Sequence, residues 1–230
     1  MSRDPEDADH GFSRRTLLAR VAFIGAGAVV VRGDAPAPAG QERAVQSGAA
    51  AASIDTARPP LETLSAIEMA TLEAIAARLI PTDGNGPGAA EAGAARYIDR
   101  AIGGALAASR EAYRNGLAAV EAYARSSKGR PFEQLSAADR DTVLGDMETN
   151  VATGFVPDAL TFFNLVRTHT IQGTFGDPYY GGNASFAGWD LIGYPGVRLA
   201  AGPDDQRMDR RPAPVRRSAY DSAMFSKKRP

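Results

Sequence analysis

The spacing of apolar residues over the middle of the chain constrains its fold more than any other feature. Between Leu64 and Gly173 apolar side chains recur three and four positions apart, and no segment alternates as a β-strand would. Such stripes occur in Ile67–Leu79, Ala94–Ile102, Leu106–Ala124, Val143–Val151 and Ala159–Thr170. The sequence therefore predicts an all-α domain, an irregular bundle of about five helices followed by a long ordered loop rich in glycine and aromatic residues.

Capping patterns predict where these helices begin and end. Ser65 with Glu68 has the spacing of a capping box, and Ser136 with Asp139 predicts a second N-terminus. The last helix is expected to have Pro157 in its first position, because proline tolerates the missing N–H there. Proline and glycine, which commonly terminate helices, predict helix ends at Pro81, Gly103-Gly104, Gly129, Gly154 and Gly173.

The segment from Gly176 to Gly196 differs from the rest of the chain. It combines glycines and prolines with several tyrosines, a phenylalanine and the one tryptophan of the sequence. Flexible linkers rarely carry so much aromatic surface. We therefore expect an ordered loop that bears a binding surface.

The N-terminus has the pattern of a twin-arginine export signal. Arg14 and Arg15 precede an apolar run from Val21 to Val31 and then small residues. This run is shorter than the roughly 20 residues that span a bilayer, which favours export over anchoring. We expect a signal peptide in 1–39, a flexible linker in 40–61, the helical domain in 62–199 and a basic, extended tail in 200–230. The expected location is the periplasm.

Composition excludes several kinds of chemistry. The formal net charge of −1 gives no overall attraction to nucleic acid, so no nucleic-acid partner is expected. The sequence has no cysteine, which excludes disulfides, thiolate catalysis and cysteine-ligated metals. Two histidines are too few for a site of several imidazoles. We expect no metal, cofactor or catalytic residue in this chain.

The residues that suit catalysis also have structural interpretations. His169 shares an apolar stripe with its neighbours, which favours a buried neutral imidazole bonded to the following loop over a catalytic base. Asp177 and Asp190 suit acid–base chemistry on a glycosidic bond, but a turn cap and an acceptor of loop N–H groups are favoured. Trp189 is suited to stacking on a sugar ring or to anchoring an interface.

After Leu199 the chain becomes polar and basic. From Arg207 to Pro230 it contains eight lysines or arginines and two acidic residues. This composition favours a solvated or partner-bound tail over a nucleic-acid arm. Tyr220 and Phe225 are candidate anchors on a partner.

Taken in order, these motifs resemble the gluconate 2-dehydrogenase subunit 3 family, the small subunit of flavin-dependent sugar or alcohol dehydrogenase complexes. The resemblance extends over residues 62–199. Its most specific part is Gly176-Asp177-Pro178-x-Tyr180-Gly181-Gly182-Asn183, followed by Gly188-Trp189 and Gly193-Tyr194-Pro195-Gly196.

The resemblance implies a role as a partner. Such small subunits bind a large flavoprotein of the glucose–methanol–choline type, which holds FAD, and electrons pass to a cytochrome c subunit or another acceptor. The small subunit carries the signal for the twin-arginine translocon, so the complex would lie at the periplasmic face of the inner membrane. By motif match and aromatic character, the candidate docking residues are Tyr179, Tyr180, Asn183, Trp189 and Tyr194. The residues suited to ordering the loop by their own chemistry are His169, Asp177 and Asp190.

Two hypotheses follow. In the first, the chain is a non-catalytic subunit that stabilises and escorts a dehydrogenase. In the second, it is an autonomous periplasmic enzyme or sugar-binding module that uses the region of His169, Asp177 and Trp189. Activity or sugar affinity of the isolated chain distinguishes them.

Overall fold

The structure is a computed structural model that describes residues 60–209 and 212–225. These residues contain α-helices and short 3-10 turns but no strand, which confirms the predicted all-α class. The expected signal peptide and nearly all of the linker lie outside the described residues. The helices are α2 (Ala66–Leu79), α3 (Ala94–Gly103), α4 (Arg110–Lys128), α5 (Ala137–Glu148), α6 (Ala159–Phe175) and α7 (Ala187–Ile192). The sixth, α7, is a short helix inside the expected loop.

The predicted capping patterns position the helices of the bundle. Ser65 Oγ accepts a hydrogen bond from the Glu68 N–H at 3.3 Å, and a carboxylate oxygen of Glu68 accepts one from the Ser65 N–H. These two bonds form the capping box of α2. Ser136 accepts from the Asp139 N–H at the start of α5. Gly129 ends α4 at φ 73°, a backbone conformation that glycine adopts without a steric cost.

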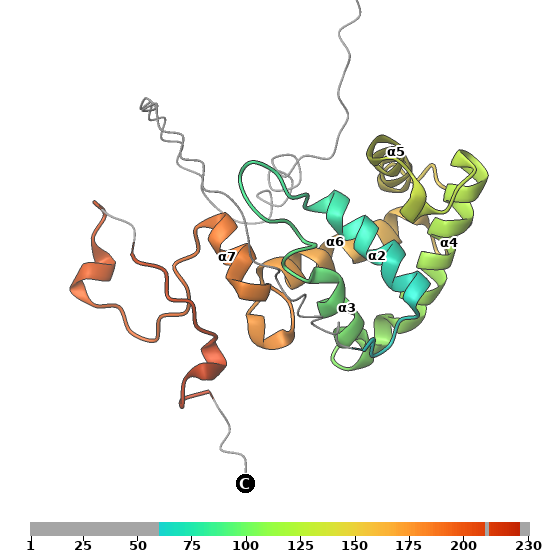
Figure 1. Cartoon of the computed structure of the whole chain (residues 1–230). Helices are drawn as coiled ribbons and strands as arrows, with labels where there is room; N and C mark the ends of the chain where they lie inside the picture. The colour runs from blue at the N-terminus through green and yellow to red at the C-terminus, as the bar shows by residue number, and fades with distance from the viewer. Residues whose placement is uncertain (1–59, 210–211, 226–230) are drawn as a thin grey trace, which may run out of the picture.

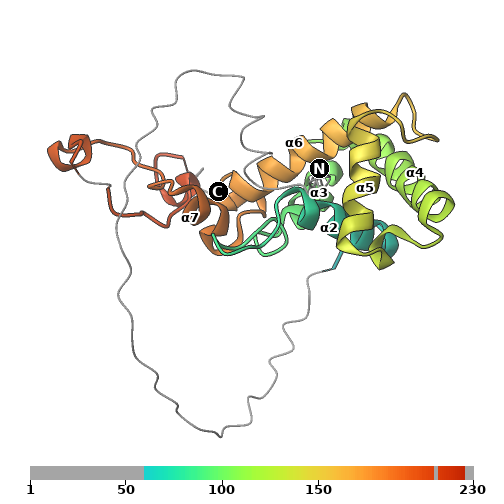
Figure 2. The same cartoon turned by 90° about the horizontal axis from the view of Figure 1, so that it is seen from above.

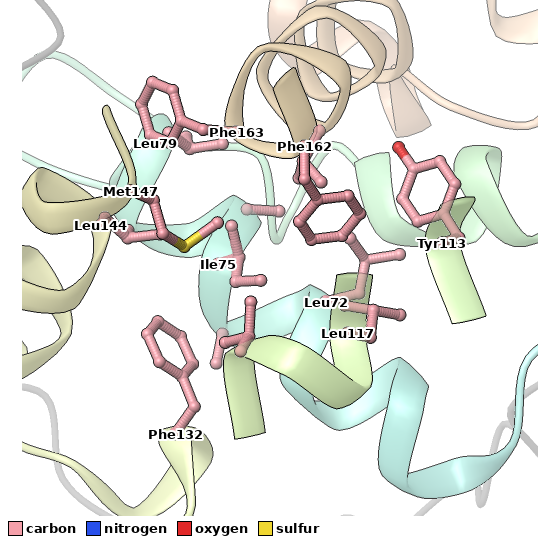
Figure 3. Packing of buried hydrophobic residues seen from close by; sticks show 14 of the residues in the cluster. Leu72, Ile75, Leu79, Tyr113, Leu117, Phe132, Leu144, Met147, Phe162 and Phe163 are labelled. Atoms are coloured by element: carbon pink, nitrogen blue, oxygen red, sulfur yellow. The ribbon is translucent and has the colours of Figure 1, made fainter. Parts of the chain in front are cut away.

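Helix α2 lies at the centre of the bundle and packs against α3, α4, α5 and α6. Leu72 and Ile75 of α2 are buried and face Phe162 of α6 (Figure 3). Leu144 and Met147 of α5 close the same core from the other side. The apolar stripes of separate helices thus meet in one core, as their spacing predicts.

Helix α6 differs from the expectation at both ends. It begins at Ala159, since Asp158 is the N-cap and Pro157 lies before it. It also continues through Gly173 to Phe175. Gly173 is buried where α6 crosses α3, and a Cβ there would lie 2.9 Å from Ala94 Cα. The glycine therefore serves close helix packing, not helix termination.

The end predicted for α5 is also wrong, because the helix stops at Glu148 before Val151 and Gly154. Asn150 has φ 62°, and the Val151 N–H donates to the Asp146 carbonyl across it. This arrangement is a Schellman motif, in which asparagine takes the left-handed position that glycine often fills. Val151 is 62% exposed and does not join the core.

The arrangement of the elements separates the bundle from the C-terminal residues. Helix α7 lies at one end of α6, and the chain beyond it extends away from α4 and α5 (Figures 1 and 2). No helix among the described residues has both the length and the apolar character that crossing a bilayer requires. The end of α6 and the chain beyond it hold the residues singled out by sequence.

Candidate functional site

The site begins with a tight turn directly after α6. Asp177 caps the 3-10 turn η4 (Pro178–Tyr180) by accepting from the Tyr179 N–H at 2.9 Å. Gly181 ends the turn at φ 92°. Because both tyrosines lie in this turn outside α6, their rings point away from the bundle core: Tyr179 is 57% and Tyr180 49% exposed.

Asn183 connects the turn to both neighbouring helices. Its N–H donates to the Gly173 carbonyl at 2.7 Å and its side-chain amide donates to the Gly176 carbonyl at 2.9 Å. Its side-chain oxygen accepts from the Gly188 N–H at 2.8 Å. Asn183 is fully buried, so this predicted docking residue orders the segment instead of presenting a side chain to a partner.

Helix α7 is held close to α6 by a glycine and the tryptophan. A Cβ on Gly188 would lie 1.8 Å from the Thr174 carbonyl oxygen, so only glycine fits there. Trp189 donates its indole N–H to the Phe175 carbonyl at 2.9 Å and is only 6% exposed. Tyr194 packs edge-on against the indole with ring centroids 4.9 Å apart and stays 41% exposed. Trp189 therefore supports the surface, whereas Tyr194 contributes to it.

His169 lies deeper, in the bundle, and its partner differs from the expected one. Its Nδ1 is 3.0 Å from the Tyr113 hydroxyl of α4, and the two rings stack. The sequence interpretation placed its hydrogen bond in the following loop. Burial lowers the pKa of His169 and raises that of Tyr113, which favours the neutral form of each side chain.

The C-terminal tail returns to this segment, which the sequence interpretation did not foresee. The Ser218 hydroxyl donates to one oxygen of Asp177 at 2.6 Å, and the Ala219 N–H donates to the other at 2.9 Å. Arg216 forms an ion pair with Asp190 at 2.6 Å. Asp177 thus caps η4 and binds the tail, whereas the carboxylate of Asp190 binds Arg216 of the tail instead of the loop N–H groups expected for it.

Three tyrosines gather where the tail meets the turn. The ring of Tyr220 stacks on that of Tyr179 with centroids 4.0 Å apart. Its hydroxyl lies 2.6 Å from that of Tyr180, and this hydrogen bond raises the pKa of Tyr180. We call Tyr179, Tyr180 and Tyr220 the tyrosine platform. Its third member comes from the tail, and the Ser218-x-x-Asp221 capping pattern was the local signal for an ordered turn there.

A further open surface of the bundle is a groove of about 520 Å³ between α2 and α4. Ile67 lines it and is 70% exposed, although its spacing placed it on the apolar face of α2. Leu117 and Ala118 form the opposite wall. Within residues 60–209 and 212–225 no group of three or more acidic or histidine side chains is arranged to hold a metal ion.

A comparison with protein-family models gives a match to the model described as Gluconate 2-dehydrogenase subunit 3, over residues 66–196. The matched range runs from the start of α2 to the end of the glycine- and aromatic-rich segment. Comparisons with curated proteins and with solved structures gave no match.

Proposed function

This chain belongs to the gluconate 2-dehydrogenase subunit 3 family, and from that premise we propose that it is a non-catalytic small subunit of a flavin-dependent dehydrogenase complex. The family is that of a subunit of the gluconate 2-dehydrogenase complex. The proposed partner is a large flavoprotein of the glucose–methanol–choline type, which holds FAD and oxidises a sugar or sugar acid. A cytochrome c subunit is a further candidate member of the complex.

The observation that carries this proposal is the family match, which includes the whole glycine- and aromatic-rich segment from Gly176 to Gly196. The exposed tyrosines of that segment support a binding role, because tyrosine is enriched in protein interfaces. The residues of the alternative hypothesis have separate structural contacts. His169 contacts Tyr113, Asp177 binds the tail and Trp189 bonds to α6. These contacts favour the subunit role over an autonomous enzyme or sugar-binding module.

We further propose that the chain escorts its partner through the twin-arginine translocon to the periplasm. Support comes from Arg14-Arg15 and the short apolar run that follows them, which lie outside the described residues. A translocon that carries folded proteins would move the complex as one unit. A partner without its own signal would then depend on this chain.

The test is to co-express the chain with the flavoprotein subunit and replace Arg14-Arg15 by Lys-Lys. The flavoprotein should then remain in the cytoplasm, and periplasmic FAD-dependent dehydrogenase activity should disappear. Arg20→Lys, outside the pair, is the matched control and should leave export unchanged. If the flavoprotein still reaches the periplasm with the Lys-Lys variant, the escort role is rejected. Co-purification of the two chains tests the subunit role separately.

A further inference from the structure

The tail is attached to the site by polar contacts, and those that Ser218 and Ala219 make are partly buried. Ser218 is buried, and both oxygens of Asp177 accept hydrogen bonds from the tail. The Val215 N–H donates to the Pro195 carbonyl at 2.9 Å, and a Cβ on Gly196 would lie 2.0 Å from the Val215 carbonyl oxygen. Residues 177–196 and residues 215–219 are therefore fitted to each other by backbone and side-chain contacts.

These contacts hold the tail without covering the aromatic surface. Tyr179 and Tyr180 remain about half exposed although Tyr220 packs on one and bonds to the other. The tail then adds Met224 and Phe225, both exposed. A segment that served to shield the tyrosines would turn its apolar side chains inward. The tail instead adds exposed apolar side chains to the surface, as is typical of a site where a partner protein binds.

We infer that the C-terminal tail, residues 212–225, is part of the surface that binds the flavin-holding subunit of the complex. The tyrosine platform forms the centre of that surface. The inference rests on the proposed function and adds to it a segment beyond the matched range 66–196. Tyrosines clustered at the centre of an interface commonly carry much of its binding energy.

The charges around the platform indicate the chemistry of the partner surface. Arg100 is exposed beside Gly181, and Arg217 is exposed next to Ser218. Asp221 also lies there and accepts from the Ser218 N–H. The platform therefore has an aromatic centre, with two exposed arginines and the carboxylates of Asp177 and Asp221 at its rim. Its complement is an apolar patch with carboxylates placed opposite the two arginines, since opposite charges at the rim of an interface speed association.

The test measures the dissociation constant between the full mature chain and the flavin-binding subunit, identified by its flavin absorbance. Tyr220→Ala should raise Kd about 30-fold, the loss expected at an interface hot spot. Deletion of residues 212–230 should raise Kd at least as much. Ile67→Ala is the matched control, because it removes an exposed apolar side chain in the α2–α4 groove and should leave Kd unchanged.

The possible outcomes separate the two proposals. If the wild-type chain and the flavin-binding subunit do not associate, the proposed function fails. If they associate and the deletion leaves Kd unchanged, only the role of the tail is overturned. Tighter binding after the deletion would identify the tail as a cover over the tyrosines and would also reject the inference. If Ile67→Ala raises Kd and Tyr220→Ala leaves it unchanged, the interface lies in the α2–α4 groove and the inference is rejected.

Discussion

At the residue scale, the glycines after α6 permit close contacts between backbones. A Cβ on Gly182 would lie 2.1 Å from the Gly173 carbonyl oxygen, and one on Gly188 would be nearer still to that of Thr174. Between them, Asn183 provides the buried amide that bonds to both helices. The Gly-Gly-Asn motif thus allows α7 to pack against α6 and sets the direction of the chain after η4.

Gly188→Ala should destabilise the protein by about 1–3 kcal/mol, because the added methyl group meets a carbonyl oxygen that cannot move without disturbing α6. Thermal unfolding followed by circular dichroism measures the effect. Gly145→Ala in α5 is the control, because nothing lies within 4 Å of the added Cβ. That control should be neutral or stabilising by up to about 1 kcal/mol. Equal effects of the two substitutions would contradict the packing argument.

His169 should make stability depend on pH. Burial disfavours the imidazolium and lowers the pKa of His169 below its ordinary value of 6.5. The unfolded chain therefore binds the proton more readily, so the stability is fully present above about pH 6.5 and declines as the pH falls below it. His169→Gln should be less stable at pH 7.5 but lose less stability on acidification to pH 5. Melting temperatures across this range measure both effects.

Tyr113→Phe is the companion variant. It removes the hydroxyl group bonded to His169 but keeps the imidazole buried. It should therefore retain a decline in stability at acid pH. If the melting temperatures of the wild type and of His169→Gln change in parallel with pH, His169 does not control the pH dependence of stability.

At the element scale, ion pairs and cap contacts fix neighbouring helices in register. Arg78 of α2 and Asp141 of α5 form a bidentate pair with both N–O distances at 2.6 Å. The hydrogen bond to Asp141 raises the pKa of Arg78. The buried carboxylate of Asp99 in α3 accepts from the N–H groups of residues 62–64 and so fixes the entry into α2. Apolar stripes bring the helices together, and these contacts define their relative positions.

A double-mutant cycle on Arg78→Met and Asp141→Ala should give a coupling free energy of about 1–2 kcal/mol, since the pair is bidentate and partly shielded from water. Denaturant unfolding of the wild type, both single variants and the double variant provides it. The exposed pair Arg207–Asp209 is the matched control and should show no measurable coupling. A coupling near zero at Arg78–Asp141 would mean that apolar packing alone holds α2 against α5.

At the scale of the whole molecule, the hydrophobic core and the proposed binding surface lie in different parts of the chain. The main hydrophobic cluster runs from Leu64 to Val166, with Ile171 and Phe175 packed against it, and includes no described residue of the tail. The tail contacts lie at η4 and α7, at the end of the molecule away from α4 and α5 (Figure 2). The bundle should therefore fold without the tail.

Deletion of residues 200–230 should lower the melting temperature by no more than about 3 °C, because it removes no core side chain. Hydrogen exchange should instead become faster at 177–194, where the deletion removes Ser218 and Arg216 from Asp177 and Asp190. Thermal melts and peptide-resolved exchange make the comparison. Loss of helical content throughout the chain would show that the tail is needed for folding.

Much of the fold was predictable from the sequence because helix formation has local signals. The capping box at Ser65 and the N-cap at Ser136 act between residues three positions apart, and apolar stripes repeat every turn. The aromatic segment and its glycine pattern were likewise visible in the sequence and pointed to the family. The sequence by itself thus determined the all-α class, the N-caps of α2 and α5, and the family to which the chain belongs.

The tertiary structure decided which side chains face outward and which distant residues meet. Gly173 stays helical because α3 crosses there, and His169 bonds to Tyr113, 56 residues away. Asp177 binds Ser218 across 41 residues. Local periodicity specifies a helical face but not the element that packs on it, because that choice depends on contacts between parts of the chain far apart in sequence.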